Sequence, residues 1–157
     1  MKDVIIYTDG ACKGNPGPGG FGIVLIYGER RKEISKGYKL TTNNRMELMA
    51  VIYALEALKM PCRVTLYSDS KYVIDAFNLG WAKKWQKNGW MRTKTHRAQN
   101  PDLWERALAV AEEHQIEYVW VRGHSDNVEN ERCDRLAVTA AEGAPDLLET
   151  DTGYNPN

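Results

Sequence analysis

Four acidic residues lie at four separate places where the sequence pattern changes from one kind of element to the next: Asp9, Glu47, Asp69 and Asp134. Carboxylate oxygens are the ligands that hard divalent cations prefer. If the fold brings the four together, they should repel one another, raise at least one pKa and need cations to balance their charge. The pattern therefore predicts a metal-dependent enzyme, provided that the acids converge.

Each acid also has an ordinary structural interpretation when it is taken alone. Asp9 suits a turn after a strand, and Glu47 suits a capping box at the start of a helix. Asp69 or its neighbour Ser70 suits a helix cap, and Asp134 suits a solvated position on a helix. Only convergence in space separates a functional site from these alternatives.

The elements around the acids follow from hydrophobic periodicity. Runs of β-branched and aromatic residues predict three consecutive antiparallel strands, at 3–9, 21–27 and 33–40. Helical spacing and further apolar runs predict the remaining elements. These are helices at 46–57, 70–80, 100–114 and 128–143, with Asn100 as an N-cap, Pro101 in the first turn, and Pro61 and Gly143 as terminators, and strands at 63–69 and 116–122.

The order of these elements gives the acids a way to meet. A strand, helix, strand order indicates parallel pairing, so the fourth strand can lie beside the first in a mixed sheet. Asp9 and Asp69 would then share one sheet edge, with Glu47 and Asp134 directed at it from two helices. We expect an α/β fold of three layers, with a five-stranded mixed sheet and helices on both faces.

Basic residues gather in one stretch, although 21 basic and 21 acidic residues leave the whole chain neutral. Residues 76–101 hold six basic side chains and no acid. Trp81 and Trp85 follow helical spacing in this stretch, and Trp90 comes soon after. The tryptophans can form a small satellite core, and the cations can meet phosphates. Both interpretations can hold together.

Composition narrows the class of protein. A chain of 157 residues suits one domain with its own core. Three cysteines without CxxC spacing indicate neither a disulfide framework nor a zinc site, and they fit a reducing cytosol. No apolar run approaches the roughly 18 residues of a membrane span, and the N-terminus lacks the apolar core of a signal peptide. We expect a cytoplasmic monomer without membrane contact.

A glycine-rich segment matches the dinucleotide-binding pattern GxGxxG at Gly17, Gly19 and Gly22. That site needs a helix directly after the glycines, whereas the sequence continues as the strand-like run IVLIY. We therefore reject a nucleotide cofactor. The glycines suit a hairpin, or a place where a nucleic-acid backbone comes close.

Five segments together resemble type 1 ribonuclease H, in its bacterial ribonuclease HI form, across residues 1–142. They are YTDGACKGNPGPGGFG, TTNNRMELMA, SDSKYV, GWAKKWQKNGW and GHSDNVENERCDRLA, in that order. The resemblance implies the ribonuclease H fold and an endoribonuclease that hydrolyses the RNA strand of RNA/DNA hybrids. It also implies Mg²⁺ or Mn²⁺ as cofactor, and products with 5′-phosphate and 3′-hydroxyl ends.

The resemblance also assigns the catalytic residues. Asp9, Glu47, Asp69 and Asp134 match the family's metal-binding acids, and His124 matches its mobile histidine. Two ions about 3.5 to 4 Å apart, present with substrate, can activate a water and stabilise the leaving 3′ oxygen. An ordinary histidine pKa of about 6.5 suits a proton carrier, although a histidine in a polar loop is also a common surface residue.

Contacts to the hybrid are likewise implied by the resemblance. The family reads the RNA 2′-hydroxyl near the glycine-rich turn and the first helix, where asparagines can alternatively serve as caps or turn residues. A threonine and an asparagine hold a DNA phosphate, and a basic protrusion, here about 81–97, grips the DNA strand. The matching residues are Gly10, Cys12, Asn15, Asn43 and Asn44, then Thr42 and Asn100, then Trp81, Lys83, Lys84, Trp85, Lys87 and Trp90, with Lys71 beside them.

Two positions depart from the family pattern. Lys71 stands where relatives commonly have a glutamine, and Leu40 stands where an arginine is often found.

A non-catalytic hybrid-binding module and the integrases and resolvases of similar fold remain as alternatives. The first is expected to lose one of the acids, and the second lacks the tryptophan-bearing lobe. Beyond the domain, residues 143–157 show no periodicity, and we expect a mobile tail there.

Overall fold

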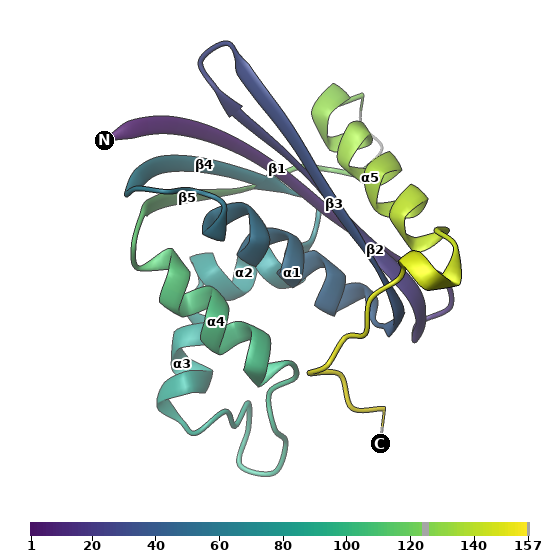
Figure 1. The fold of residues 1–157 in the computed structure, drawn as a ribbon. Coiled ribbons are helices and arrows are strands. Elements are labelled where there is room, and N and C mark those ends of the chain that lie inside the picture. The colour runs from purple at the N-terminus through teal and green to yellow at the C-terminus, as the bar shows by residue number, and fades with distance from the viewer. Residues whose placement is uncertain (124–125, 157) are drawn as a thin grey trace.

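The computed structural model describes residues 1–123 and 126–156 of the chain. Within these ranges the chain forms one five-stranded sheet in the order β3-β2-β1-β4-β5, with helices on both faces (Figure 1). The expected three-layer α/β fold with a mixed sheet is confirmed. None of the helices in the described part of the chain is long and apolar enough to cross a membrane.

The first half of the sheet is antiparallel. Strands β1 (Lys2–Cys12), β2 (Gly17–Tyr27) and β3 (Arg30–Thr41) pair in sequence order. Strand β1 continues three residues beyond the end expected from the apolar run, because pairing with β2 reaches Cys12 opposite Gly19. Asp9 therefore lies inside a strand and not in a turn.

The second half of the sheet is parallel. Strand β4 (Cys62–Ser68) lies beside β1, and β5 (Gln115–Trp120) lies beside β4. Thr8 is opposite Ser68 in this register. Asp9 and Asp69 each follow directly after that pair, so the expected meeting of the two acids at one sheet edge is confirmed.

In the described part of the chain, α1 and α2 pack on one face of the sheet with α3 and α4 packed against them, and α5 packs on the other face (Figure 1). Helix α1 is buried over most of its surface, as its apolar composition predicts. Thr42 is its N-cap and accepts a hydrogen bond from Arg45 N, so the alternative interpretations of Glu47 as part of a capping box and of the two asparagines as caps are wrong. The helices are α1 (Asn43–Glu56), α2 (Lys71–Asn78), α3 (Trp81–Lys87) and α4 (Pro101–Ala111) on one side of the sheet, and α5 (Val128–Ala141) on the other.

Helix α5 packs closely on β2 because glycines face it. A Cβ added at Gly22 would lie 2.3 Å from the carbonyl oxygen of Cys133, and one at Gly20 would lie 2.5 Å from that of Ala137. The glycine-rich segment thus forms the first part of strand β2 and does not precede a helix, and it allows close helix packing at Gly20 and Gly22. Close packing of α5 also brings Asp134 toward the sheet.

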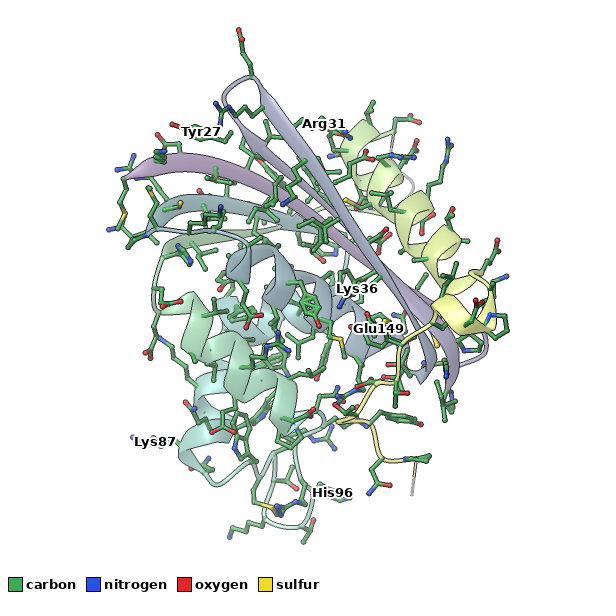
Figure 2. The ribbon with its side chains drawn as sticks, viewed as in Figure 1. Tyr27, Arg31, Lys36, Lys87, His96 and Glu149 are labelled. Carbon is green, nitrogen blue, oxygen red and sulfur yellow. The ribbon has the colours of Figure 1, made fainter. Side chains whose placement is uncertain are left out.

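The segment after α5 differs from the mobile tail expected from the sequence. It forms a short 3₁₀ turn, η1 (Pro145–Leu147), and then runs beside β3 toward α4 (Figure 1). The Glu149 carbonyl accepts from Lys39 N at 2.9 Å, and Glu149 N donates to the Gly37 carbonyl at 2.9 Å. Lys36 forms an ion pair with the Glu149 carboxylate at 2.9 Å, and Figure 2 shows the two side chains together. Pairing with an edge strand requires no hydrophobic periodicity, so the sequence pattern gave no sign of it.

Candidate active site

The acids meet near the ends of the neighbouring central strands β1 and β4, which we call the carboxylate edge. Strand β1 and helix α1 are in close contact there, at Gly10. A Cβ added there would lie 2.5 Å from Glu47 N and 2.6 Å from the carbonyl carbon of Met46, which are backbone atoms that cannot move aside cheaply. Gly10 N donates to Asp9 Oδ1 at 2.9 Å and also to Glu47 Oε1. One backbone N–H therefore holds two carboxylates together, and only glycine permits it.

Three carboxylates converge at this edge. Oxygen atoms of Asp9, Glu47 and Asp69 lie within 4.8 Å of one another. Asp9 and Glu47 are each 4% exposed, whereas Asp69 is half-buried. Buried carboxylates at this distance form a donor set that suits a hard cation. Three of the four acids predicted from the sequence are therefore placed together.

Burial and mutual repulsion shift the protonation of the cluster. Burial raises the pKa of Asp9, and the charges of Glu47, Asp69 and Asp134 raise it further. Burial also raises the pKa of Glu47, although hydrogen bonds from Asp9, Gly10 and Ser70 oppose the shift. Asp9 and Glu47 interact so closely that they titrate as a pair. Without a cation, the cluster retains protons well above the ordinary range of a carboxyl group.

Asp69 is positioned from β5 and the loop that follows it. Trp120 Nε1 donates to the Asp69 carbonyl at 3.0 Å. A Cβ added at Gly123 would lie 2.9 Å from Asp69 Oδ2, so the chain passes close to the carboxylate there. Ser70, and not Asp69, is the N-cap of α2, and its side chain accepts from Val73 N. The sequence singled out neither Trp120 nor Gly123, because their roles depend on the parallel pairing of β4 and β5.

Asp134 projects from α5 on the opposite face of the sheet from α1. It is half-buried and lies outside the 4.8 Å group found in the described residues, yet its charge contributes to the raised pKa of Asp9. Cys133, its neighbour, donates through Sγ to the Tyr7 carbonyl at 3.2 Å, which ties this turn of α5 to β1. His124 lies outside the residues that the structure describes.

A second set of predicted residues surrounds the start of α1. Asn15 Oδ1 accepts from Asn43 N at 3.1 Å, which joins the glycine-rich turn to the helix. The Cys12 thiol is half-buried and donates to the Thr41 carbonyl at 3.4 Å. A pocket of about 460 Å³ opens beside these residues, and its lining includes Asn15, Thr42, Asn44 and Asn100. Several of the predicted contacts for the 2′-hydroxyl and the DNA phosphate thus gather around the start of α1, the helix that carries Glu47.

Asn100 occupies the N-cap position of α4, but its side chain does not cap the helix. Its backbone is left-handed, with φ of 58°, and Pro101 follows in the first turn as expected. The side chain instead accepts from Arg45 Nη1 at 3.3 Å and donates to Tyr72 Oη at 3.2 Å. The capping prediction is wrong because these long-range partners fix the amide.

The basic lobe consists of α3 and the loop to α4, and Lys87 and His96 mark it in Figure 2. Trp85 and Trp90 pack against the core, while Trp81 is 43% exposed. A groove of about 560 Å³ lies where the lobe meets the body, and its lining includes Trp81, Trp85 and Asn44. The exposed basic side chains of the lobe are Lys83, Lys84, Lys87, Arg92, Lys94 and Arg97. Both interpretations of the lobe therefore fit the structure.

Lys71 lies between the carboxylate edge and the lobe. Its side chain is exposed, and Nζ sits 4.8 Å from the ring centre of Trp120. Leu40 is also exposed, at 44%. The two positions that depart from the family pattern are therefore both on the surface.

Known proteins resemble this chain in sequence. The family model described as RNase H matches residues 1–142. The chain is 63% identical over 154 residues to ribonuclease H of Syntrophus aciditrophicus, covering 98% of this chain and 88% of that protein. It is 56% identical over 153 residues to ribonuclease HI of a Synechocystis species, covering 97% of this chain and 96% of that protein.

Solved structures share the fold. LC9-RNase H1, described as a type 1 RNase H with the type 2 active-site motif, has a TM-score of 0.81 at 35% identity, over 90% of this chain and 72% of that chain. LC11-RNase H1, solved in complex with RNA/DNA hybrid, has a TM-score of 0.68 at 25% identity, over 88% of this chain and 96% of that chain. The likeness therefore extends over most of the sheet and its helices.

Proposed function

The chain belongs to the ribonuclease H family, and on that premise we propose that it hydrolyses the RNA strand of RNA/DNA hybrids at the carboxylate cluster. The observation that carries the proposal is the convergence of Asp9, Glu47 and Asp69 within 4.8 Å. We assign Asp134 of α5 to the same set, because its charge contributes to the raised pKa of Asp9. A purely structural role would not explain why a fold keeps repelling carboxylates buried at one edge.

The donor set fits a divalent cation. All the side chains are carboxylates, and hard ions such as Mg²⁺ and Mn²⁺ select oxygen ligands. We propose that Asp9, Glu47, Asp69 and Asp134 hold Mg²⁺, with Mn²⁺ as a substitute, and that two ions bind when the hybrid is present. When bound, such ions supply activation of a water and charge stabilisation at the departing 3′ oxygen.

The protein's own contribution is to hold these ligands in place. Gly10 N fixes Asp9 and Glu47 relative to each other through its two hydrogen bonds. The indole of Trp120 fixes the backbone of Asp69 through its 3.0 Å hydrogen bond. Ligands fixed before the substrate arrives need no reorganisation during the reaction. We assign proton transfer to His124, which is the family's mobile histidine by sequence match.

Recognition of the hybrid is assigned to the surfaces beside the cluster. LC11-RNase H1 was solved with an RNA/DNA hybrid, and we extend that substrate to this chain. We propose that Gly10, Cys12, Asn15, Asn43 and Asn44 read the RNA strand, where a 2′-hydroxyl offers both donor and acceptor. Phosphates of the DNA strand meet neutral and basic groups. These are Thr42 and Asn100 in the pocket, and Lys71, Trp81, Lys83, Lys84, Trp85, Lys87 and Trp90 along the groove and lobe.

The test compares a labelled RNA/DNA hybrid, the same RNA single-stranded, and duplex DNA, each with Mg²⁺ or EDTA. Wild type should cut only the RNA strand of the hybrid, leaving 5′-phosphate and 3′-hydroxyl ends, and EDTA should stop the reaction. Asp9→Asn is the matched control, because it keeps the shape of the side chain while removing a charged ligand. Tight hybrid binding without cutting by wild type would overturn the proposal in favour of a binding module.

A further inference from the structure

A buried arginine joins three distant parts of the chain. Arg45, in the first turn of α1, is 2% exposed. Its Nε and Nη2 donate to the two carboxylate oxygens of Asp151 at 2.7 and 3.1 Å. Its Nη1 and Nη2 donate to the two oxygens of Asp102, in the first turn of α4, at 3.0 and 2.7 Å. Two bidentate pairs leave the guanidinium plane rigidly held.

Asp151 belongs to the segment that follows α5. It is 7% exposed, and its Oδ2 also accepts from Thr41 Oγ1 at 2.7 Å. The next turn of the segment packs on the same group, because a Cβ added at Gly153 would lie 2.0 Å from Asp102 Oδ2 and 2.7 Å from Arg45 Nη2. The segment after α5 is thus built into the start of α1.

The arginine also holds a residue of the proposed phosphate pocket. Arg45 Nη1 donates to Asn100 Oδ1 at 3.3 Å, and the Asn100 amide donates to Tyr72 Oη at 3.2 Å. Tyr72 is itself held by Trp104 Nε1 at 2.8 Å. The side chain of Asn100 is therefore oriented from both ends, although its backbone is left-handed.

The same segment forms one wall of that pocket. The lining of the pocket of about 460 Å³ combines residues at the starts of α1 and α4 with residues of the segment after α5: Thr42, Asn44, Arg45, Asn100 and Asp102, and Gly153, Tyr154 and Asn155. A ligand that entered it would touch both the start of α1 and the segment after α5. Figure 1 shows that segment, in yellow, descending from α5 toward the loop before α4.

We propose that the C-terminal segment is part of the nucleic-acid site, in which Asp151 fixes Arg45, and Arg45 in turn positions Asn100 for a DNA phosphate. This inference rests on the proposed function, because it deepens the recognition of the DNA strand. Arg45 acts here as a positioning residue. Arg45 and Asp102 also line the pocket, but the guanidinium is already paired with two carboxylates, so we assign the hydrogen bonds to the phosphate to Thr42 and Asn100.

The arrangement couples docking of the segment to binding of the hybrid. A pocket with one wall from the segment binds its ligand better when the segment is docked, and by reciprocity a bound ligand holds the segment in place. Hydrogen exchange at the backbone amides of residues 149–155 should therefore report hybrid binding. Protection of this segment by duplex DNA, which lacks the RNA strand, should be weaker.

The experiment uses the full chain with Asp151→Asn, and with Glu149→Gln as matched control. Glu149 lies two residues away in the same segment, but its carboxylate pairs with Lys36 of β3 at 2.9 Å and not with Arg45. Affinity is measured in Ca²⁺ or EDTA for the native hybrid and for hybrids that carry one neutral methylphosphonate, moved stepwise along the DNA strand. Gly153→Ala is a second variant, which crowds Asp102 and Arg45 without changing any charge.

The expected pattern separates positioning from general stability. At one DNA position the methylphosphonate should weaken wild type and Glu149→Gln by about tenfold, the value of one hydrogen bond to a charged group. Asp151→Asn and Gly153→Ala should bind the native hybrid about tenfold more weakly and should lose sensitivity at that position. Turnover at saturating hybrid should stay near that of wild type.

Two results would overturn the inference. In the first, Asp151→Asn and Gly153→Ala bind the hybrid with wild-type affinity and keep the wild-type sensitivity to the methylphosphonate. In the second, both variants bind more weakly but lose the same affinity at every methylphosphonate position, as a generally loosened fold would. Either leaves the proposed function intact as long as wild type still binds and cuts the hybrid. Failure of wild type to bind hybrid at all would instead refute the proposed function.

Discussion

Replacing Asp9 by asparagine should make the metal-free protein more stable while it abolishes cleavage. The reason is the geometry of the cluster, in which oxygens of three carboxylates lie within 4.8 Å. At an effective dielectric of about 20, two unit charges at that distance repel by about 3 kcal/mol. The fold avoids part of this repulsion because burial and the neighbouring acids raise the pKa of Asp9, so that it retains a proton.

Retaining that proton has its own cost. An Asp with an ordinary pKa of about 3.9 loses about 4 kcal/mol if it must stay protonated at pH 7, at about 1.36 kcal/mol per unit. Asparagine resembles the protonated acid without this cost, and its Oδ1 can still accept from Gly10 N. We expect Asp9→Asn to raise the free energy of unfolding by about 2 to 4 kcal/mol at pH 7 in EDTA.

The stability difference between Asp9→Asn and wild type should depend on pH, and its direction follows from the raised pKa of Asp9. A carboxyl whose pKa is raised in the fold destabilises the fold above its unfolded pKa, and has no effect below it, where both states are protonated. The advantage of Asp9→Asn should therefore vanish near pH 3 to 4 and grow as the pH rises toward 7. Urea unfolding in EDTA across this range measures it, because the slope m reveals any change in the unfolded state.

Asp3→Asn is the matched control. Its carboxylate pairs with Arg63 on the surface, where the Asp3 side chain is 74% exposed, so the change should stay within about 0.5 kcal/mol. Saturating Mg²⁺ should narrow the gap by stabilising wild type. If Asp9→Asn were no more stable than wild type at pH 7 in EDTA, the account of a repelling cluster would be wrong.

Four further outcomes follow from the site and its surroundings. Trp120→Phe removes the N–H that holds the Asp69 carbonyl, and turnover should fall about fivefold with little change in KM, since one hydrogen bond contributes about 1 kcal/mol; an unchanged turnover would remove Trp120 from the site. Mg²⁺ affinity, measured by calorimetry, should weaken as the pH falls from 8 to 6, because the raised pKa values of Asp9 and Glu47 make protons compete with the ion. The loss should reach about tenfold per pH unit for each proton that the ion displaces. His124→Ala should lower turnover and largely spare hybrid binding, and a variant with full turnover would refute its role. Replacing the lobe lysines Lys83, Lys84 and Lys87 by neutral residues should reduce the slope of log affinity against log salt. The expected reduction is about 0.7 to 0.9 for each phosphate that the variant no longer neutralises. An unchanged slope would show that the DNA strand binds elsewhere.

The sequence predicted the parts of the fold that periodicity and strand order control. Runs of β-branched and aromatic residues located the strands, and the strand, helix, strand order indicated that β4 can lie beside β1. The meeting of Asp9 and Asp69 followed from that one pairing. Glu47 could be aimed at the same edge because the segment that contains it reads as a helix.

The remaining features depend on contacts between residues far apart in the chain. Thr42 caps α1, but local propensity does not favour it as a cap over the asparagines that follow it. Arg45 holds the side chain of Asn100, and local propensity gives no sign of a contact between residues so far apart in sequence. The docked segment after α5 was missed because Asp151 is a single buried acid in a polar stretch. Its partner, Arg45, lies 106 residues away in sequence.

We propose that Asp9, Glu47 and Asp69 form the cation site of this ribonuclease. Anomalous diffraction from crystals of the full chain grown with Mn²⁺ is the decisive test. We expect manganese bound by these three carboxylates, with Asp134 joining when the hybrid is present, and no manganese there in Asp9→Asn. If manganese is absent from the three carboxylates at a concentration that supports cleavage of the hybrid, they do not form the cation site.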